Sequence, residues 1–236
     1  MLVDVQFLPS ASGWPGLAAA AGLAEDLGYT RVWLFDHLAA SSLNVEAAML
    51  ECCTTLGALA AVTSRIGLGT LVANVANRYP AVLALAVATA QHISGGRVVA
   101  GLGAGAAPGS RWATEHDAAG IALVADAAER HDAVVRQIEA IRAATDTPVI
   151  VGVNSTALAG IAGQRADGIN VRLSAERAGE LISTARDAAG DRAVEVSAYT
   201  VDDGAGIRQR ATALGIDRLI LVTTPDRFID AQPAPG

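Results

Sequence analysis

The stretch Val32-Trp33-Leu34-Phe35-Asp36-His37 is an apolar run that ends in two polar residues. A second run ends in the glycines of Gly101-Leu102-Gly103-Ala104-Gly105, and both lie in the block from Gly22 to Gly105. Asp36 and His37 add nothing to an apolar core, whereas barrels and open parallel sheets place ligands at strand carboxyl ends. We therefore expect these two strand ends to share one ligand-binding mouth.

Apolar runs of strand length alternate with helical patterns along the chain. The expected strands are Leu2–Leu8, Arg31–Phe35, Ile66–Ala73, Val98–Leu102, Pro148–Val153, Gly168–Val171, Val194–Val201 and Arg218–Val222. The expected helices are Leu17–Leu27, Val45–Val62, Pro80–Ile93, Ala119–Ala143, Thr156–Gln164, Ala175–Ala188, Gly206–Leu214 and a short one after Pro225, and Ala106–Ala118 is expected to be the fourth βα loop. Eight βα units in order predict an α/β protein, a closed (β/α)8 TIM barrel, as a single domain over residues 1–236 with a frayed tail from Ala231.

Composition excludes several classes of protein. The chain has 236 residues, of which 52% are hydrophobic and 4% aromatic, so it can bury a core of aliphatic side chains. Its net charge of −7 and its lack of basic runs argue against nucleic-acid binding. Cys52 and Cys53 are adjacent and lack the further Cys or His residues of a zinc site, so we expect reduced thiols and no metal site. No membrane-length apolar run or basic leader is present, which predicts a cytoplasmic protein.

Several spaced motifs in the first half of the chain resemble the bacterial luciferase-like oxidoreductases, above all the branch that uses the deazaflavin F420. In chain order the motifs are Ala24–Tyr29, Val32–His37, Glu51–Ala60, Thr63–Val72, Arg78–Ala81 and Ser94–Gly105, with weaker similarity at Pro148–Gly152 and Arg165–Gly168. The resemblance implies a luciferase-like barrel with a reduced insertion between the fourth and fifth strands. It also implies oxidoreductase activity on a small-molecule substrate.

Asp36 and His37 are the candidate catalytic residues. A histidine with a reference pKa near ~6.5 can exchange a proton near neutral pH, and a neighbouring carboxylate can hold or tune it. In the F420-dependent enzymes that this chain resembles, the matching pair lies beside the deazaflavin ring. The alternative is that His37 is a polar strand cap that only closes a loop.

The resemblance also assigns cofactor-binding residues on the third and fourth strands. Leu71 and Val72 match a non-prolyl cis peptide behind the cofactor ring, with Asn74 beyond it, although a plain buried strand is the alternative. Gly103, Ala104 and Gly105 allow close approach of the ring to the backbone, and their spacing does not fit a Rossmann fingerprint. FMN-dependent relatives carry an arginine where this chain has Ala104, which favours F420 over FMN.

A phosphate-binding turn is expected after the fifth strand, at Gly152, Val153, Asn154 and Ser155. Small and hydroxylated residues that open a helix offer N–H groups to an anion. Asn154 or Ser155 is equally well explained as an ordinary N-cap. Arg78, Arg111 and Arg172 are expected to be solvated surface residues.

F420-dependent hydride transfer is therefore the leading hypothesis. The alternatives are an FMN-dependent luciferase-like monooxygenase, a non-catalytic flavin- or F420-binding barrel, and a barrel enzyme without any flavin. Some F420-dependent sugar-phosphate dehydrogenases carry a catalytic glutamate where this chain has Ala106-Ala107, so their chemistry is not expected here. Because the insertion after the fourth strand is reduced, the loop Ala106–Ala118 is expected to serve as any lid over the mouth. Substrate choice is expected to depend on the loops Ser10–Trp14, Ala39–Asn44 and Ala106–Ala118. The helices Val45–Val62 and Pro80–Ile93 are candidates for pairing in a homodimer.

Overall fold

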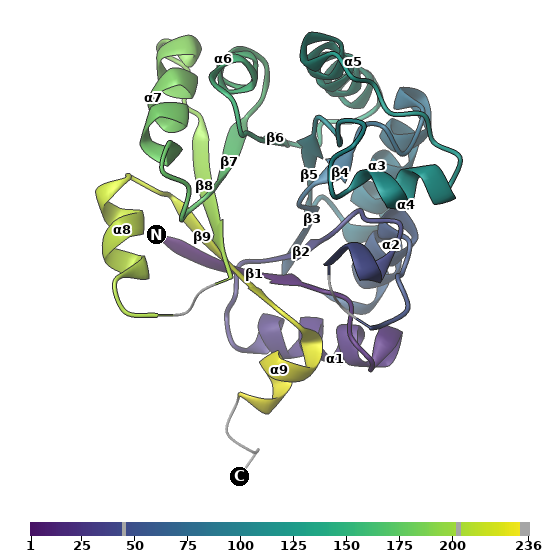
Figure 1. Cartoon of the computed structure of the whole chain (residues 1–236). Coiled ribbons are helices and arrows are strands. Elements are labelled where there is room, and N and C mark those ends of the chain that lie inside the picture. The colour runs from purple at the N-terminus through teal and green to yellow at the C-terminus, as the bar shows by residue number, and fades with distance from the viewer. Residues whose placement is uncertain (44–45, 202–203, 232–236) are drawn as a thin grey trace.

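The parallel strands of a computed structural model close into a barrel (Figure 1). The structure describes residues 1–43, 46–201 and 204–231. The strands are β1 (Leu2–Phe7), β2 (Arg31–Leu34), β3 (Gly67–Thr70), β4 (Ala73–Asn74), β5 (Val98–Gly103), β6 (Val149–Gly152), β7 (Gly168–Arg172), β8 (Glu195–Thr200) and β9 (Arg218–Thr223). Their order is β3-β2-β1-β9-β8-β7-β6-β5-β4, and pairing of β3 with β5 closes the ring. Because β4 continues the path of β3, the strands fill eight barrel positions, as the sequence predicts.

Helices follow the strands and cover the outside of the barrel (Figure 1). They are α1 (Gly13–Asp26), the 3-10 helix η1 (Ala40–Leu43), α2 (Cys52–Val62), α3 (Pro80–Ser94), α4 (Ala113–Ala118), α5 (Ala127–Ala144), α6 (Thr156–Arg165), α7 (Ala178–Ala189), α8 (Ile207–Ala213) and α9 (Pro225–Asp230). Alternate side chains of each strand point outward, and those of Val32, Leu68, Val149 and Ile169 are fully buried against the helices. Small helix residues such as Ala20, Ala21 and Ala24 let the helices approach the sheet closely.

Several expected elements have different bounds in the structure. The third strand is split, because Leu71 and Val72 interrupt the ladder between β3 and β4. The expected helix Val45–Val62 is wrong over its first part: α2 begins at Cys52, where the side chain of Glu51 accepts hydrogen bonds from two backbone N–H groups. Val45 itself, Asn44 of the expected specificity loop and most of the expected frayed tail lie outside the described residues.

The expected helix Ala119–Ala143 is also wrong at its start. Asp126 caps α5 by accepting a hydrogen bond from the Glu129 N–H at 2.8 Å, so the helix begins at Ala127. The expected loop Ala106–Ala118 contains the short helix α4. At the N-terminal side, α1 already begins at Gly13, so Trp14 belongs to its first turn rather than to a loop.

The barrel interior has an apolar layer above a charged layer. Trp33, Leu71, Val99, Ile150 and Ile220 form the apolar layer. Gly69 is required beside it, because a side chain at that position would collide with the Trp33 ring. The charged layer, at the opposite end from the strand carboxyl ends, is built by Asp4, Arg31, Glu195 and Arg218. Polar groups at that end of a barrel serve stability rather than chemistry.

A carboxylate on α1 fastens the turn before β3. The Oε2 atom of Glu25 accepts hydrogen bonds from the backbone N–H groups of Ser64 at 3.0 Å, Arg65 at 2.6 Å and Ile66 at 2.8 Å. Burial opposes ionisation, but these donors and the charge of Arg65 lower the pKa of Glu25 from 4.5 to about 2. Because the pKa is depressed in the folded state, this stabilisation is present above pH 4.5 and is lost as the pH falls toward 2.

We expect Glu25→Gln to lower the free energy of unfolding at pH 7 by about 1–3 kcal/mol, the usual size of hydrogen bonds to a charged group. The deficit should shrink as the pH is lowered from 4.5 toward 2, because the wild type loses the same interaction. Urea unfolding at several pH values measures both effects. Asp26→Asn is the control, because the Asp26 side chain is 75% exposed. A constant deficit at every pH would contradict the assignment.

Candidate functional site

The carboxyl ends of β2, β4, β5 and β6 meet at one mouth of the barrel. Asp36 lies just after β2, and its Oδ2 atom accepts a hydrogen bond from the backbone N–H of Asn74 on β4 at 2.9 Å. Asn74 is paired in register with Gly103 at the end of β5. The expectation that the Asp-His and glycine-rich strand ends lie together is therefore confirmed.

Asp36 is a buried anchor rather than an open catalytic group. Its carboxylate forms a two-bond ion pair with Arg78, at 2.7 Å and 2.8 Å, and only 1% of its side chain is exposed. Burial alone would lower the pKa of Arg78, but the hydrogen bonds and charge of Asp36 raise it. Arg78 also bonds Glu51, the N-cap of α2. The expectation of a solvated Arg78 is wrong, because this guanidinium ties the end of β2 to α2.

The carboxylate that holds His37 is Glu115, not Asp36. The Nδ1 atom of His37 lies 2.7 Å from Oε1 of Glu115, whose side chain is 2% exposed. Oε2 of the same carboxylate accepts the backbone N–H groups of Leu38 at 3.0 Å and Ala39 at 3.2 Å. Sequence reasoning missed Glu115 because 78 residues separate it from His37. Its only sequence signal was its place in the expected lid.

This pair determines which nitrogen of His37 carries the proton. Burial opposes ionisation of Glu115, but the hydrogen bond and charge of His37 and the two backbone donors lower its pKa. An ionised carboxylate only accepts hydrogen bonds, so Nδ1 of His37 donates. In the neutral ring Nε2 then carries a lone pair, and it has no hydrogen bond to any residue that the structure describes. With 22% of its side chain exposed, His37 is accessible to a bound molecule.

A second residue of α4 fastens the same helix over the mouth. His116 is 1% exposed, its Nδ1 lies 2.9 Å from the carbonyl oxygen of Trp112, and its Nε2 lies 2.9 Å from the side chain of Asn74. Asn77 is 3.0 Å from Nε2 and donates to the backbone oxygen of Asp36 at 3.1 Å. Both consecutive residues Glu115 and His116 therefore anchor α4 to strand ends, and this was not visible from the sequence.

The floor of the mouth is shaped by glycines around one valine. The peptide bond between Leu71 and Val72 is cis, as the resemblance implies. A side chain at Gly103 would collide with Val72, and one at Gly152 would lie 2.9 Å from its Cγ1 atom. Gly105 has a positive φ of 77°, and a Cβ there would lie 2.9 Å from the amide oxygen of Asn74. The side chains of Val72 and Asn74 thus occupy the space that side chains at these three positions of the β5 and β6 ends would otherwise fill.

The expected phosphate-binding turn contains an ordinary helix cap. Ser155 is the N-cap of α6, with its hydroxyl accepting the Leu158 N–H at 3.3 Å. Asn154 is exposed beside it. Arg172, at the end of β7, is exposed and bonds the Ser174 hydroxyl at 3.1 Å. Within the described residues no hydrogen bond joins this turn to Asp36 or His37, so it forms a separate side of the mouth.

Two hollows are lined by none of Asp36, His37 and the floor glycines, although the first reaches the end of β2. One, of about 40 Å³, is lined by Phe35 and Met49 among other apolar residues and is large enough for only a few water molecules. The other, of about 400 Å³, is lined by residues of β9 and α9, and none of the candidate site residues lines it. Neither hollow accounts for the chemistry of the mouth, which rests on the groups that converge there.

Glu115→Gln is expected to reverse the tautomer of His37. The glutamine amide keeps an acceptor for the backbone of Leu38 and Ala39 but presents an N–H₂ group to Nδ1, which must then accept. We expect the ring ¹⁵N chemical shifts of His37 to change from the Nδ1–H to the Nε2–H pattern. Asp117→Asn, on the same helix but exposed, is the control and should leave the shifts unchanged. An unaltered His37 spectrum in Glu115→Gln would contradict this role.

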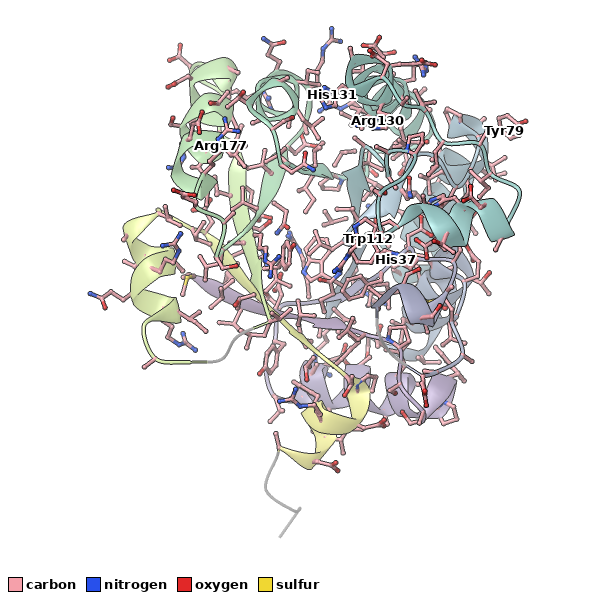
Figure 2. All side chains as sticks on the ribbon, viewed as in Figure 1. His37, Tyr79, Trp112, Arg130, His131 and Arg177 are labelled. Carbon is pink, nitrogen blue, oxygen red and sulfur yellow. The ribbon has the colours of Figure 1, made fainter. Side chains whose placement is uncertain are left out.

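The fold and these contacts define a class: a parallel barrel enzyme with a histidine–carboxylate pair beside a glycine-lined floor at its carboxyl-end mouth. Figure 2 shows His37 and Trp112 next to each other there. The family model described as luciferase-like monooxygenase matches residues 4–201. The chain therefore belongs to the luciferase-like family of oxidoreductase enzymes.

Relatives of this chain include curated archaeal reductases. A 5,10-methylenetetrahydromethanopterin reductase of Methanolobus tindarius is 28% identical over 98% of this chain and 74% of its own length. A reductase of the same name from Archaeoglobus fulgidus is 36% identical over 44% of this chain and 29% of its own length. Similarity therefore extends over the whole chain in one case and over a shorter part in the other.

Solved structures share the fold. An F420-dependent secondary alcohol dehydrogenase, in complex with an F420-acetone adduct, superposes with a TM-score of 0.73 at 18% identity, covering 98% of this chain and 97% of its own. The F420-dependent tetrahydromethanopterin reductase of Methanopyrus kandleri gives a TM-score of 0.63 at 20% identity, covering 85% of this chain and 66% of its own. Within the residues that the structure describes, no helix is both long enough and apolar enough to span a lipid bilayer.

Proposed function

We propose that this protein is an F420-dependent oxidoreductase that transfers a hydride between the deazaflavin and a small organic substrate. The observation that carries the proposal is the placement of His37, held by Glu115, at the same mouth as the glycine floor around Val72. The names of the solved tetrahydromethanopterin reductase and secondary alcohol dehydrogenase include F420, which supports the choice of cofactor. FMN is the alternative.

The residues at the mouth fit a flat ring with an anionic tail. Gly103 and Gly152 make room for the side chain of Val72, which is itself only partly buried, and Gly105 is exposed beside Asn74, so Val72 and Gly105 are the parts of this floor that a ring could contact. Asn74 belongs to the same floor. Val153, Asn154 and Ser155 open α6 and would meet a phosphate, because the first N–H groups of a helix attract anions. Ala104 offers no guanidinium to an FMN phosphate, which favours F420.

The bound deazaflavin would supply the hydride chemistry. The protein contributes the proton transfer: Nε2 of His37 accepts a proton from a substrate hydroxyl, or in the reverse direction an imidazolium donates one to a carbonyl oxygen. Glu115 holds Nδ1–H throughout and stabilises the positive charge that develops on the ring. Asp36 takes no part in the proton transfer; it fixes the end of β2 through Arg78 and Asn74.

A binding titration tests the proposal. Apo protein is titrated with F420 and, separately, with FMN, and we expect tight binding of F420 only. Tight FMN binding without F420 binding would select a monooxygenase, and absence of affinity for either would reject a flavin enzyme. Ser155→Ala should weaken the binding of F420 more than the binding of the F420 chromophore that lacks the anionic tail. Asp126→Ala, which removes a comparable cap from α5, is the matched control and should change neither affinity.

We also propose that the protein forms a homodimer through α2 and α3. Val62 on α2 is 58% exposed, and Val82 and Leu85 on α3 are 54% and 68% exposed. Large apolar side chains gathered on two adjacent helices favour burial against a second copy. Light scattering after size exclusion should report a dimer, and Leu85→Glu should convert it to monomer. A monomeric wild type would contradict this arrangement.

A further inference from the structure

The lid residue Arg111 has an uncommitted guanidinium. All 17 basic residues of the chain are arginines, and most of those described form hydrogen bonds with carboxylate, carbonyl or hydroxyl oxygens. Arg111 is exposed, as the sequence predicts, and has no such bond among the described residues; its guanidinium carbon lies 3.7 Å from the centroid of the Trp112 ring. Among the described residues Arg136, Arg165, Arg208 and Arg227 also lack such bonds, but they lie on the outer helices α5, α6, α8 and α9, and Arg165 is ion-paired with Glu139 at 3.5 Å.

The residue before Arg111 provides an independent observation. The hydroxyl of Ser110 is buried and has no hydrogen-bond partner among the residues that the structure describes. Its backbone is satisfied, since its N–H bonds the carbonyl of Ala107 at 3.1 Å and its carbonyl accepts the Ala113 N–H at 3.0 Å. A buried hydroxyl without a partner is costly unless a ligand supplies one. The lid therefore holds two adjacent polar groups whose donors are unused.

Trp112 joins these groups to the candidate catalytic residue. The indole lies 4.9 Å from the His37 ring, centroid to centroid, and Figure 2 shows the two side chains together at the mouth. The contact between the indole and Arg111 restricts the motion of the Arg111 guanidinium. This restriction lowers the entropy cost of binding an anion. A molecule seated on the indole would lie close to both the His37 ring and the guanidinium.

We propose that Ser110, Arg111 and Trp112 form a recognition site for a planar, aromatic carboxylate substrate. The indole stacks on the aromatic ring and the guanidinium binds the carboxylate through paired N–H donors, next to the buried and unpartnered Ser110 hydroxyl. This assignment rests on the proposed function only in naming the bound molecule as the substrate. The recognition itself requires no cofactor.

Binding of two similarly shaped ligands to the apo protein tests whether the site recognises the negative charge. Benzoate and benzamide share a ring but differ in charge, and ligand-observed NMR titration gives both dissociation constants. We expect the wild type to prefer benzoate by about tenfold, the size of one charge-assisted hydrogen bond. Arg111→Gln should abolish the preference, whereas Arg136→Gln, the matched loss of one positive charge on α5, should retain it. Trp112→Leu should weaken both ligands alike.

Retention of the preference in Arg111→Gln, or its equal loss in Arg136→Gln, would overturn the proposal. The anionic tail of the cofactor is the other source of the same chemistry, so Arg111→Gln is also titrated with F420 and with its tail-less chromophore. Selective weakening of F420 would assign Arg111 to the cofactor and overturn the substrate role. If F420 does not bind but the benzoate preference persists, the proposed function fails and this site stands.

Discussion

His37→Ala is expected to lower kcat/KM by about 10²–10⁴-fold, the usual contribution of a positioned general acid–base. Cofactor affinity should remain nearly unchanged. The reason is that Nε2 of His37 is the exchangeable nitrogen at the mouth, while its ring has no role in holding the glycine floor. The loss should be larger than that of Glu115→Gln, which misorients the proton but leaves the ring in place.

The measurement is oxidation or reduction of F420 with a panel of alcohols and carbonyl compounds, alongside cofactor titrations of each variant. His131→Ala, on α5, is the matched histidine control and should retain wild-type rates. If His37→Ala and Asp36→Ala leave both turnover and cofactor affinity unaltered, the enzymatic assignment fails and a non-catalytic binding barrel remains. Asp36→Ala is expected to act through Arg78 and Asn74, so it should also reduce stability.

Arg218→Met is expected to destabilise the protein by about 3–5 kcal/mol, because it leaves a buried charge without its partner. Arg218 is 4% exposed, and Asp4, at 0%, is bonded to it at 2.8 Å and to the Trp33 indole N–H at 2.8 Å. Glu195 contacts the guanidinium at 3.3 Å and also pairs with Arg31 at 2.9 Å. Arg31 and Arg218 lower the pKa of Glu195, against the effect of burial.

Urea unfolding at neutral pH measures this effect. The double variant Asp4→Leu/Arg218→Met should recover much of the loss, since a buried ion pair replaced by apolar residues is often neutral in stability. Arg177→Met, which breaks the exposed ion pair with Glu180, is the control and should change stability little. A small effect of Arg218→Met would mean that water reaches Asp4 and satisfies its charge.

Much of the fold was predictable because its signals are local. Apolar runs such as those at Val98 and Gly168 become strands wherever both faces are covered, and Pro80 starts α3 as expected. The two misplaced helix starts at α2 and α5 lie where a side-chain cap decided the boundary. Glu51 and Asp126 are the N-caps that set the starts of α2 and α5. Apolar residues before each cap extend the helical pattern, so periodicity alone placed the helix starts too early.

The site was predictable in position but not in its contacts. The strand ends at His37 and Gly103 were recognised because polar or glycine residues there have no core role. The hydrogen-bond partners of His37 and Asp36 were not recognised, because Glu115 and Arg78 reach the end of β2 from different parts of the chain. Asp36 follows β2 directly beside His37, yet its carboxylate bonds Arg78 and Asn74 rather than the imidazole.

The order of apolar runs, turns and caps along this chain determined by itself that a parallel barrel forms and which end of it carries the ligand mouth, because alternation and strand polarity are local properties. Only the tertiary structure decided that Glu115 orients His37, that Arg78 is buried and that Ser110 and Arg111 have unused donors. Those facts depend on distances between side chains far apart in sequence, which are set when the ring of strands closes and α4 packs over it.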